Sequence, residues 1–287
     1  MKPDSEPGDS LGQIRGDARG AGNSLTPRPT ESVSRRFHIG SSLTRPAGPP
    51  PPVELWPQEW REVVFKGYPR LAIRPMPAPA LSPRFTLRQA LKQRRSCRLY
   101  SPEFLPLATL SSLLHFSVGV RNSSAPDLST RYYPSAGARY PLETYVAARN
   151  VEGLPAGLYH YFVPGHGLEE VELGPTPLAE IDAQVTYEWM TASAAGVLLT
   201  AVFGRTQTKY GERGYRHVLT EVGAVMQNVY LVSAALGIGC CAYGGYFDDG
   251  LNALLDLEDD QEGVVAMMFV GSGQESAPGK VAGDDLG

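Results

Sequence analysis

Apolar residues recur at helical spacing in three stretches of the chain, and each stretch predicts a helix. Leucines three or four residues apart across residues 107–118, followed by Gly119 as a C-cap, predict a core helix. Thr86 and Gln89 have the spacing of a capping box, which predicts a shorter helix just after them. A long apolar run over residues 218–238 predicts a third, buried helix.

Short runs rich in Val, Tyr and other strand-forming residues predict five strands. Residues 144–149 and 158–163 are separated by a turn that contains Gly and Pro, which favours a hairpin. Residues 196–203, 240–247 and 264–270 have a similar composition. Helices that surround a mixed, mainly antiparallel sheet make an α+β domain.

The N-terminal part of the chain has a different composition from the rest. Residues 1–33 are rich in Gly, Pro, Ser and Arg without periodic apolar positions, so we expect a disordered N-terminal arm. Residues 34–85 form a Pro-rich segment that we expect to pack on the domain through Trp56 and Trp60. Residues 86–272 are then the main domain, and residues 273–287 a flexible tail.

Composition excludes several classes of function. The chain has 287 residues, of which 42% are hydrophobic, and this is enough for one large domain with a core. The net charge of -4, from 26 basic and 30 acidic residues, gives no electrostatic footprint for nucleic acid or an anionic membrane. Three cysteines, two of them adjacent, supply neither a disulfide framework nor metal-ligand spacing. We therefore expect no metal and a reducing compartment.

Two further features predict a cytoplasmic location without a membrane partner. Glu221, Gln227 and Asn228 interrupt the apolar run, and a membrane-spanning helix would have to hold them in lipid. The N-terminus lacks the basic start and the apolar region of a signal peptide.

Two polar motifs suggest chemistry. Lys209 and Tyr210 stand side by side just ahead of the long apolar helix and offer a base and an acid. Arg94, Ser96 and Arg98 alternate, so in an extended segment they share one face, where guanidinium and hydroxyl groups can bind a phosphate. The alternatives are a charged surface turn for the first motif and a solvated basic loop for the second.

Two loops contain small residues that let backbone groups approach a flat ligand. One loop comprises Pro134, Ser135, Ala136 and Gly137. The other follows a predicted strand and comprises Tyr243, Gly244 and Gly245. Each is equally consistent with a plain turn or a tight bend.

In this order and spacing, the motifs between about Arg36 and Gly271 resemble the nitroreductase-like flavoproteins, specifically their SagB-type branch, which includes the azoline (thiazole/oxazole) dehydrogenases. The resemblance implies a nitroreductase-like α+β fold, bound FMN and a homodimer with two shared flavin sites. It implies that Arg94, Ser96 and Arg98 hold the FMN phosphate and that residues 134–137 cover the flavin ring from the neighbouring subunit. Residues 243–245 would present backbone groups near the reactive flavin nitrogen.

The resemblance also implies a reaction. Azoline dehydrogenases have an adjacent Lys-Tyr as their proposed catalytic pair, which corresponds to Lys209 and Tyr210. Lys209 would remove a proton from a thiazoline or oxazoline ring of a modified peptide, a hydride would pass to FMN, and Tyr210 would donate or orient. The pKa of Lys209 must then be lowered by burial or by positive charge, for which Arg205, Arg213 and Arg216 are candidates. The implied partner is a cyclodehydratase, and the implied electron acceptor is oxygen.

Two other functions are compatible with these residues. An NAD(P)H-dependent nitro or quinone reductase would use the same flavin without needing Lys209. No G-x-G-x-x-G fingerprint is present, but relatives dock nicotinamide directly over the flavin. A flavin-bound scaffold without catalysis, which recruits partners of a peptide-modifying complex through the Pro-rich arm, is the third possibility.

Overall fold

The computed structural model describes residues 32–43, 52–60, 64–121, 130–258 and 260–273. Two compact units are distinguished, Met1–Ser42 and Leu43–Gly287. In the first, helix α1 (Val33–Gly40) begins after Ser32, whose hydroxyl accepts a hydrogen bond from the Arg35 N–H. The helix thus starts at the last residue of the predicted disordered arm. Residues 1–31 of that arm, residues 44–51 and 61–63 of the predicted Pro-rich segment and residues 274–287 of the predicted tail lie outside the described residues.

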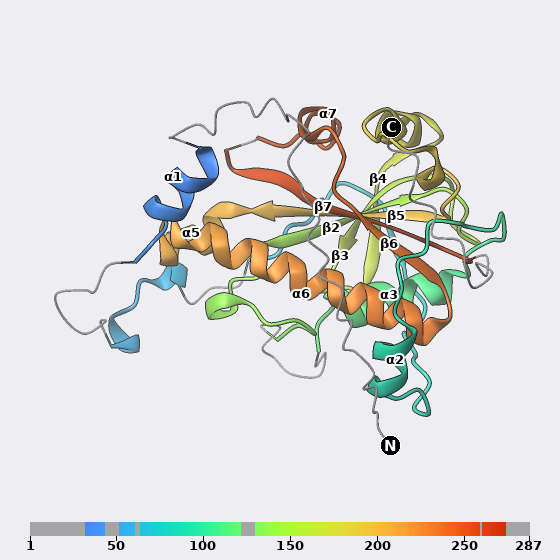
Figure 1. Cartoon of the computed structure of the whole chain (residues 1–287), viewed down its shortest axis with the longest axis horizontal. Coiled ribbons are helices and arrows are strands. Elements are labelled where there is room, and N and C mark those ends of the chain that lie inside the picture. Colours follow the sequence, from blue (N-terminus) through green and yellow to red (C-terminus); the bar gives the residue numbers. More distant parts are fainter. Residues whose placement is uncertain (1–31, 44–51, 61–63, 122–129, 259, 274–287) are drawn as a thin grey trace, which may run out of the picture. The chain divides into compact units, whose positions relative to one another are not determined.

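The second unit is built on one seven-stranded sheet with the strand order β1-β4-β3-β2-β5-β7-β6 (Figure 1). Every pair of neighbouring strands in this sheet is antiparallel, so in the described chain the sheet is antiparallel throughout rather than mixed. The strands are β1 (Ile73–Pro75), β2 (Leu142–Ala148), β3 (Gly157–Phe162), β4 (Gly167–Leu173), β5 (Ala195–Val202), β6 (Gly239–Tyr243) and β7 (Glu262–Gly271).

Helices cover both faces of the sheet. Alternate residues of the central strands point into two separate cores, with Val146 and Leu199 in one core and Tyr145 and Leu198 in the other. The first core lies under α3 and α6, and the second lies under α4 and α7 (Figure 1). The helices of this unit are α2 (Leu87–Gln93), α3 (Leu107–Val118), α4 (Thr176–Ala183), α5 (Phe203–Tyr210), α6 (Arg213–Leu236) and α7 (Asp248–Leu254).

Helix α6 is the longest of the described helices and strands. It packs against α3, α5 and α2 and against β6 and β7. It is long and apolar enough to span a membrane by length and composition, but it lies in the core, with Val218, Val225 and Val229 buried. The helix ends at Gly237, whose left-handed φ of 72° suits glycine.

The local sequence signals are confirmed. The Thr86–Gln89 capping box opens α2, α3 ends before Gly119, and the predicted hairpin is formed by β2 and β3. Six of the helices and strands were not predicted from the sequence: α1, β1, β4, α4, α5 and α7.

A buried ionic cluster ties the sheet to α5. His160 bridges two carboxylates, with its Nδ1 2.7 Å from Glu169 and its Nε2 3.4 Å from Glu143. Glu143 also accepts a hydrogen bond from Arg205 of α5, at 2.5 Å. Burial opposes ionisation of Glu143, but the His160 hydrogen bond and the Arg205 charge outweigh it and lower the pKa of this carboxyl. His160 is therefore a structural histidine that helps to fix the position of α5.

Candidate active site

Lys209 and Tyr210 lie in the last turn of α5, which residues 211 and 212 separate from α6. Both side chains are half-buried. The chain leaves the helix at Gly211, with φ 54° and ψ -144°, a conformation that favours glycine. The sharp turn between α5 and α6 thus presents the Lys-Tyr pair at the N-terminal end of the long helix.

The loop of residues 134–137 lies directly against this pair. A Cβ built on Gly137 would stand 2.6 Å from the Tyr210 hydroxyl oxygen and 3.0 Å from Lys209 Nζ. Gly137 also has a φ of 62°, in the left-handed region. Two motifs about seventy residues apart in the sequence are therefore in contact, and only glycine fits at their junction.

The surroundings of Lys209 favour loss of its proton. Partial burial and the positive charge of Arg139 lower the pKa of Lys209. The charge comes from Arg139 and not from Arg205, which was a candidate from the sequence, because Arg205 is paired with Glu143. The ammonium also lies 3.7 Å from the centre of the Trp56 ring, a cation–π contact that favours the charged form.

The anchoring role predicted for the two tryptophans agrees with their contacts. Trp60 donates its indole N–H to the Thr208 carbonyl oxygen, at 3.1 Å. The Trp56 and Trp60 rings meet edge to face, 5.9 Å apart. Through these contacts the two tryptophans, which precede β1 in the chain, pack against the end of α5.

The Arg94–Arg98 segment follows α2 and runs beside β6. The Cys97 N–H donates to the Cys240 carbonyl oxygen, at 2.8 Å. The Ser96 and Tyr230 hydroxyl oxygens are 3.0 Å apart, whereas Cys97 Sγ points towards Gly239. The expected alternation therefore holds for Ser96 and Cys97.

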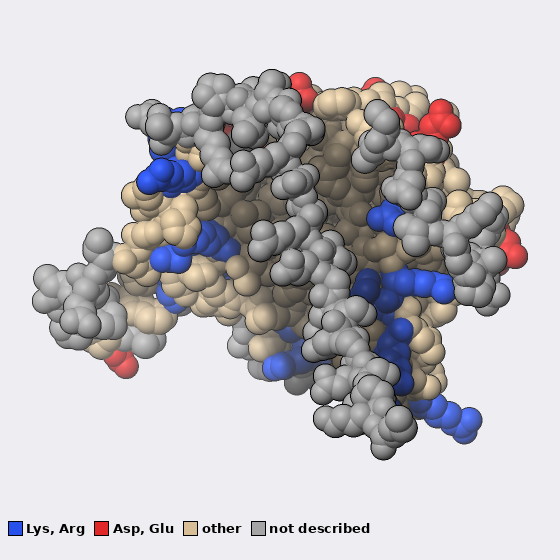
Figure 2. All heavy atoms as spheres, viewed as in Figure 1, with Lys and Arg blue, Asp and Glu red and all other residues tan. Residues whose placement is uncertain are grey.

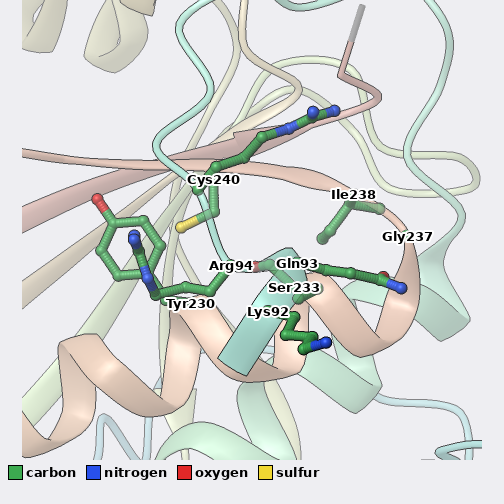
Figure 3. Close-up of a pocket in the computed structure, with 10 residues that line it drawn as sticks. Lys92, Gln93, Arg94, Tyr230, Ser233, Gly237, Ile238 and Cys240 are labelled. Atoms are coloured by element: carbon green, nitrogen blue, oxygen red, sulfur yellow. The ribbon is translucent and has the colours of Figure 1, made fainter. Parts of the chain in front are cut away.

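A cavity of about 480 Å³ lies beside this segment (Figure 3). Arg94 lies along the Tyr230 ring, with its guanidinium carbon 5.4 Å from the ring centre. Lys and Arg side chains gather around α2 on the face that Figure 2 shows. The lining residues are Lys92, Gln93, Arg94, Arg95, Tyr230, Ser233, Ala234, Gly237, Ile238 and Cys240.

The cavity lining differs in three positions from the sequence prediction. Arg95, which strict alternation turns away, lines the cavity together with Arg94. Ser96 and Arg98 do not line it. The reason is that Arg94 is the C-cap of α2, so regular extended alternation begins only after it. Three cations without a carboxylate among the described lining residues fit a dianionic phosphate such as that of FMN.

Tyr230 is a central residue of this region that the sequence motifs did not include. Its hydroxyl group accepts a hydrogen bond from the Ala242 N–H at 2.8 Å and also meets Ser96. It therefore connects α6, β6 and the Arg-rich segment. The available signal was an aromatic residue with a polar end inside the apolar run of residues 229–232.

The loop of residues 243–245 is divided between the core and the surface. The Tyr243 side chain packs in the core under α4 and α7, where its hydroxyl donates to the Gly245 carbonyl oxygen at 2.7 Å and accepts from the Thr186 N–H at 3.0 Å. Gly244 is exposed, and a Cβ built on it would meet nothing within 4 Å. The Tyr243 ring is thus structural, and only the backbone of the two glycines is open to a ligand.

The structure does not bring all the predicted site residues to one place in a single chain. The Lys-Tyr pair and loop 134–137 lie near His217 and Glu221 of α6. The 480 Å³ cavity lined by Lys92, Arg94 and Arg95, here called the cationic cavity, lies near Tyr230 and Gly237. Glu221 and Tyr230 are nine residues apart, which is about 14 Å along a helix. The two groups of residues therefore occupy different parts of the same helix.

Comparison with known proteins gives the family. The profile of the nitroreductase family matches residues 91–272. A protein of Methanocaldococcus jannaschii whose name assigns it to the nitroreductases is 36% identical over 177 residues, which are 60% of this chain and 85% of the relative. The microcin B17-processing protein McbC of Escherichia coli is 28% identical over 179 residues, which are 58% of this chain and 62% of McbC.

Solved structures agree on the fold. A nitroreductase structure from Anabaena variabilis superposes with a TM-score of 0.68 and 22% identity, covering 84% of this chain and 47% of that one. A chain of the E. coli microcin synthetase McbBCD complex, with truncated pro-MccB17 bound, has a TM-score of 0.55 and 21% identity, covering 85% of this chain and 92% of that one. The fold, the matched residues and the order of the motifs agree, and the chain belongs to the nitroreductase family.

Proposed function

We propose that this protein is an FMN-dependent dehydrogenase of the SagB type that oxidises thiazoline or oxazoline rings in a ribosomally made peptide to azoles. The observation that carries the proposal is the contact of Lys209 and Tyr210 with the backbone of Gly137. This contact, together with the lowered pKa of Lys209, supports a base and a phenol acting next to a flat ligand bound at this loop.

Each residue then has a distinct task. FMN, when bound, supplies a hydride acceptor for the ring that is oxidised. Lys92, Arg94 and Arg95, with Ser96 held by Tyr230, would hold the phosphate group. Arg98 remains a proposed phosphate ligand from the resemblance. Lys209 in its neutral form accepts the ring proton, and Tyr210 donates a hydrogen bond to the ring heteroatom or orients the ring.

The arrangement along α6 supports a homodimer with shared sites. The Lys-Tyr pair and the cationic cavity lie apart on α6, and in this proposal one subunit supplies the phosphate ligands while the other supplies the loop and the pair. Similarity to McbC, a microcin B17-processing protein also found in the McbBCD complex with a bound peptide, supports a peptide substrate and a cyclodehydratase partner. Free cysteines among the described residues, Cys97, Cys240 and Cys241, agree with a cytoplasmic protein.

Replacement of the base tests the reaction. Lys209→Met should bind FMN as the wild type does, because Lys209 lies away from the phosphate cavity, and its turnover of a thiazoline peptide should fall by about 100-fold or more. Turnover is measured by mass spectrometry as the loss of two hydrogen atoms per ring. Arg88→Met, which removes an exposed cation of α2, is the matched control. Undiminished turnover by Lys209→Met would exclude Lys209 as the base.

Mixing two inactive variants tests the shared site. Arg94→Gln and Lys209→Met should each be inactive alone at low FMN. If each site draws on both subunits, a mixed dimer contains one site with neither substitution, and activity returns on subunit exchange. If each site lies within one subunit, both sites of the mixed dimer carry a defect and activity does not return.

An NAD(P)H-dependent nitro or quinone reductase is the second candidate function. The observation in its favour is the higher identity to the M. jannaschii protein, 36% against 28% for McbC. Rapid bleaching of the flavin bands on anaerobic addition of NADH or NADPH would favour this candidate. Bands that persist, while a thiazoline peptide bleaches them, would favour the azoline dehydrogenase.

A further inference from the structure

A carboxyl group without a partner is buried beside the Lys-Tyr region. Glu221 of α6 is only 3% exposed, and neither of its carboxyl oxygens has a hydrogen-bond partner. The Ser135 hydroxyl and the Ala136 N–H face it and favour its ionised form, but neither completes a hydrogen bond. A buried polar group is normally paired, and the described residues provide no hydrogen-bond partner for Glu221.

Glu221 lies in the wall of a cavity of about 280 Å³. The loop of residues 134–137 forms one side of the cavity, and α6 forms the other side. His217, one helical turn before Glu221, packs its ring against Tyr210, with 5.0 Å between ring centres. The cavity therefore adjoins the Lys-Tyr pair. Its lining residues are Pro134, Ser135, Ala136, His217, Thr220, Glu221 and Ala224.

Burial favours the neutral form of the carboxyl. Burial raises the pKa of Glu221 to about 8, against the opposing influence of Ser135 and of the Arg131 charge. Arg131 does not form an ion pair with Glu221; its guanidinium instead lies 5.0 Å from the Tyr140 ring centre and donates to the Tyr133 hydroxyl. A neutral carboxylic acid presents one O–H donor beside one carbonyl acceptor.

That pair of groups matches an amide, in which a carbonyl oxygen stands beside an N–H. A cationic ligand is disfavoured because it would meet the charge of Arg131. The apolar side chains of Pro134, Ala136 and Ala224 suit the flat, uncharged faces of an amide.

We propose that Glu221, as a carboxylic acid, binds an amide-type group in this cavity through a paired hydrogen bond. The group has two sources: a peptide bond of the substrate, or the carbonyl and N–H edge of the flavin ring. The inference deepens the proposed function and rests on it for the identity of these ligands. Its test does not need turnover, so failure of azoline oxidation and failure of this site give different results.

The titration of Glu221 is the direct measurement. In protein with ¹³C-labelled glutamate, the carboxyl resonance that Glu221→Gln removes is followed against pH in flavin-free protein, with FMN, and with N-methylacetamide as the amide probe. A ligand that accepts the O–H hydrogen bond favours the protonated form and moves the midpoint upwards. A shift with FMN identifies the flavin edge, and a shift with N-methylacetamide alone identifies the substrate amide. No shift with either ligand would overturn the proposal.

Two variants separate binding from structure. Glu221→Gln keeps an uncharged donor and acceptor of the same shape, whereas Glu221→Leu removes both. Affinity for the ligand identified above should stay within about threefold in the first variant and fall by about tenfold in the second. Wild-type affinity should also decline as pH rises through about 8, while that of Glu221→Gln stays constant. Equal affinity of the wild type and both variants at every pH would overturn the assignment.

Discussion

The hydroxyl oxygen of Tyr210 lies 2.6 Å from the position that a Cβ would take on Gly137, so no side chain fits between the Lys-Tyr pair and the small-residue loop. The loop backbone and the pair are therefore held as one surface. Any side chain at position 137 must displace either the phenol or the loop, because real Cβ atoms do not approach other heavy atoms so closely.

The first prediction concerns this contact. Gly137→Ala should reduce turnover by at least about tenfold, because it moves Tyr210 and Lys209, and it should cost about 1 kcal/mol of stability from the left-handed φ of 62°. Gly153→Ala is the matched control, since Gly153 has a φ of 72° but nothing within 4 Å of a built Cβ. It should lose similar stability and retain activity. Equal turnover in the two variants would show that the contact does not matter for the reaction.

The second prediction concerns Trp56, whose ring lies against the Lys209 ammonium. The face of Trp56 stabilises the Lys209 ammonium at 3.7 Å, so Trp56→Leu, which keeps an apolar cover, should lower the pKa of Lys209 further. If neutral Lys209 is the active form, the limb of kcat/KM that rises with pH should move down by about half to one pH unit. Trp60→Leu, with a ring 5.9 Å from Nζ, should move it less. A limb that moves upwards would contradict the cation–π role.

The sequence predicted elements whose signals are local. The capping box of α2, the leucine periodicity of α3 and the apolar run of α6 each involve residues within one or two turns of one another. Strand β4 was missed because its sequence, GLEEVEL, contains three glutamates. One of them, Glu169, is buried only because His160 of the neighbouring strand pairs with it. No local pattern carries that information.

In the candidate site, too, the residue types could be predicted from local sequence, whereas the long-range contacts could not. The residue types of the Lys-Tyr pair and of the loop 134–137 were visible in the sequence, but their contact at Gly137 depends on the packing of α5 against distant residues. Likewise, Arg139 and Trp56 act on Lys209 although they are 70 and 153 residues away in the chain. Residues that tune a site through long-range contacts, Tyr230 among them, carry no spacing signal.

The third prediction concerns the ionic cluster that fixes α5. Glu143→Gln leaves the buried Arg205 guanidinium without its counter-charge and should cost about 3–5 kcal/mol of unfolding free energy in denaturant titration. Glu170→Gln, which breaks an ion pair with the partly exposed Arg74 at the sheet edge, should cost less than about 1 kcal/mol. The folded-state pKa of Glu143 is lowered, so its contribution is present above pH 4.5 and is lost as pH falls through the folded value. The unfolding free energies of Glu143→Gln and of the wild type should therefore converge in acid.

The fourth prediction concerns Tyr230. Tyr230→Phe removes the hydroxyl that joins Ser96 to the backbone of β6, and FMN affinity should fall by about fivefold to tenfold, as measured by fluorescence titration. Tyr159→Phe provides the comparison, because it deletes a hydrogen bond to the Pro155 carbonyl oxygen and lies outside the cationic cavity. It should lose stability without losing flavin. If Tyr230→Phe binds FMN as tightly as Tyr159→Phe does, the hydroxyl does not order the phosphate ligands.

The last prediction concerns the stability cost of Glu221. Its pKa rises from 4.5 to about 8 on folding, so between these values the folded protein holds a proton that the unfolded chain has released. Stability must then fall as pH rises through this window, with a slope of up to about 1.4 kcal/mol per pH unit. Glu221→Gln lacks the ionisable group, so its Tm should exceed that of the wild type above pH 8 and approach it near pH 4.5. Glu180→Gln, at an exposed position of α4, should follow the wild type at every pH. A constant difference between Glu221→Gln and the wild type across this range would show that the carboxyl does not change its protonation on folding.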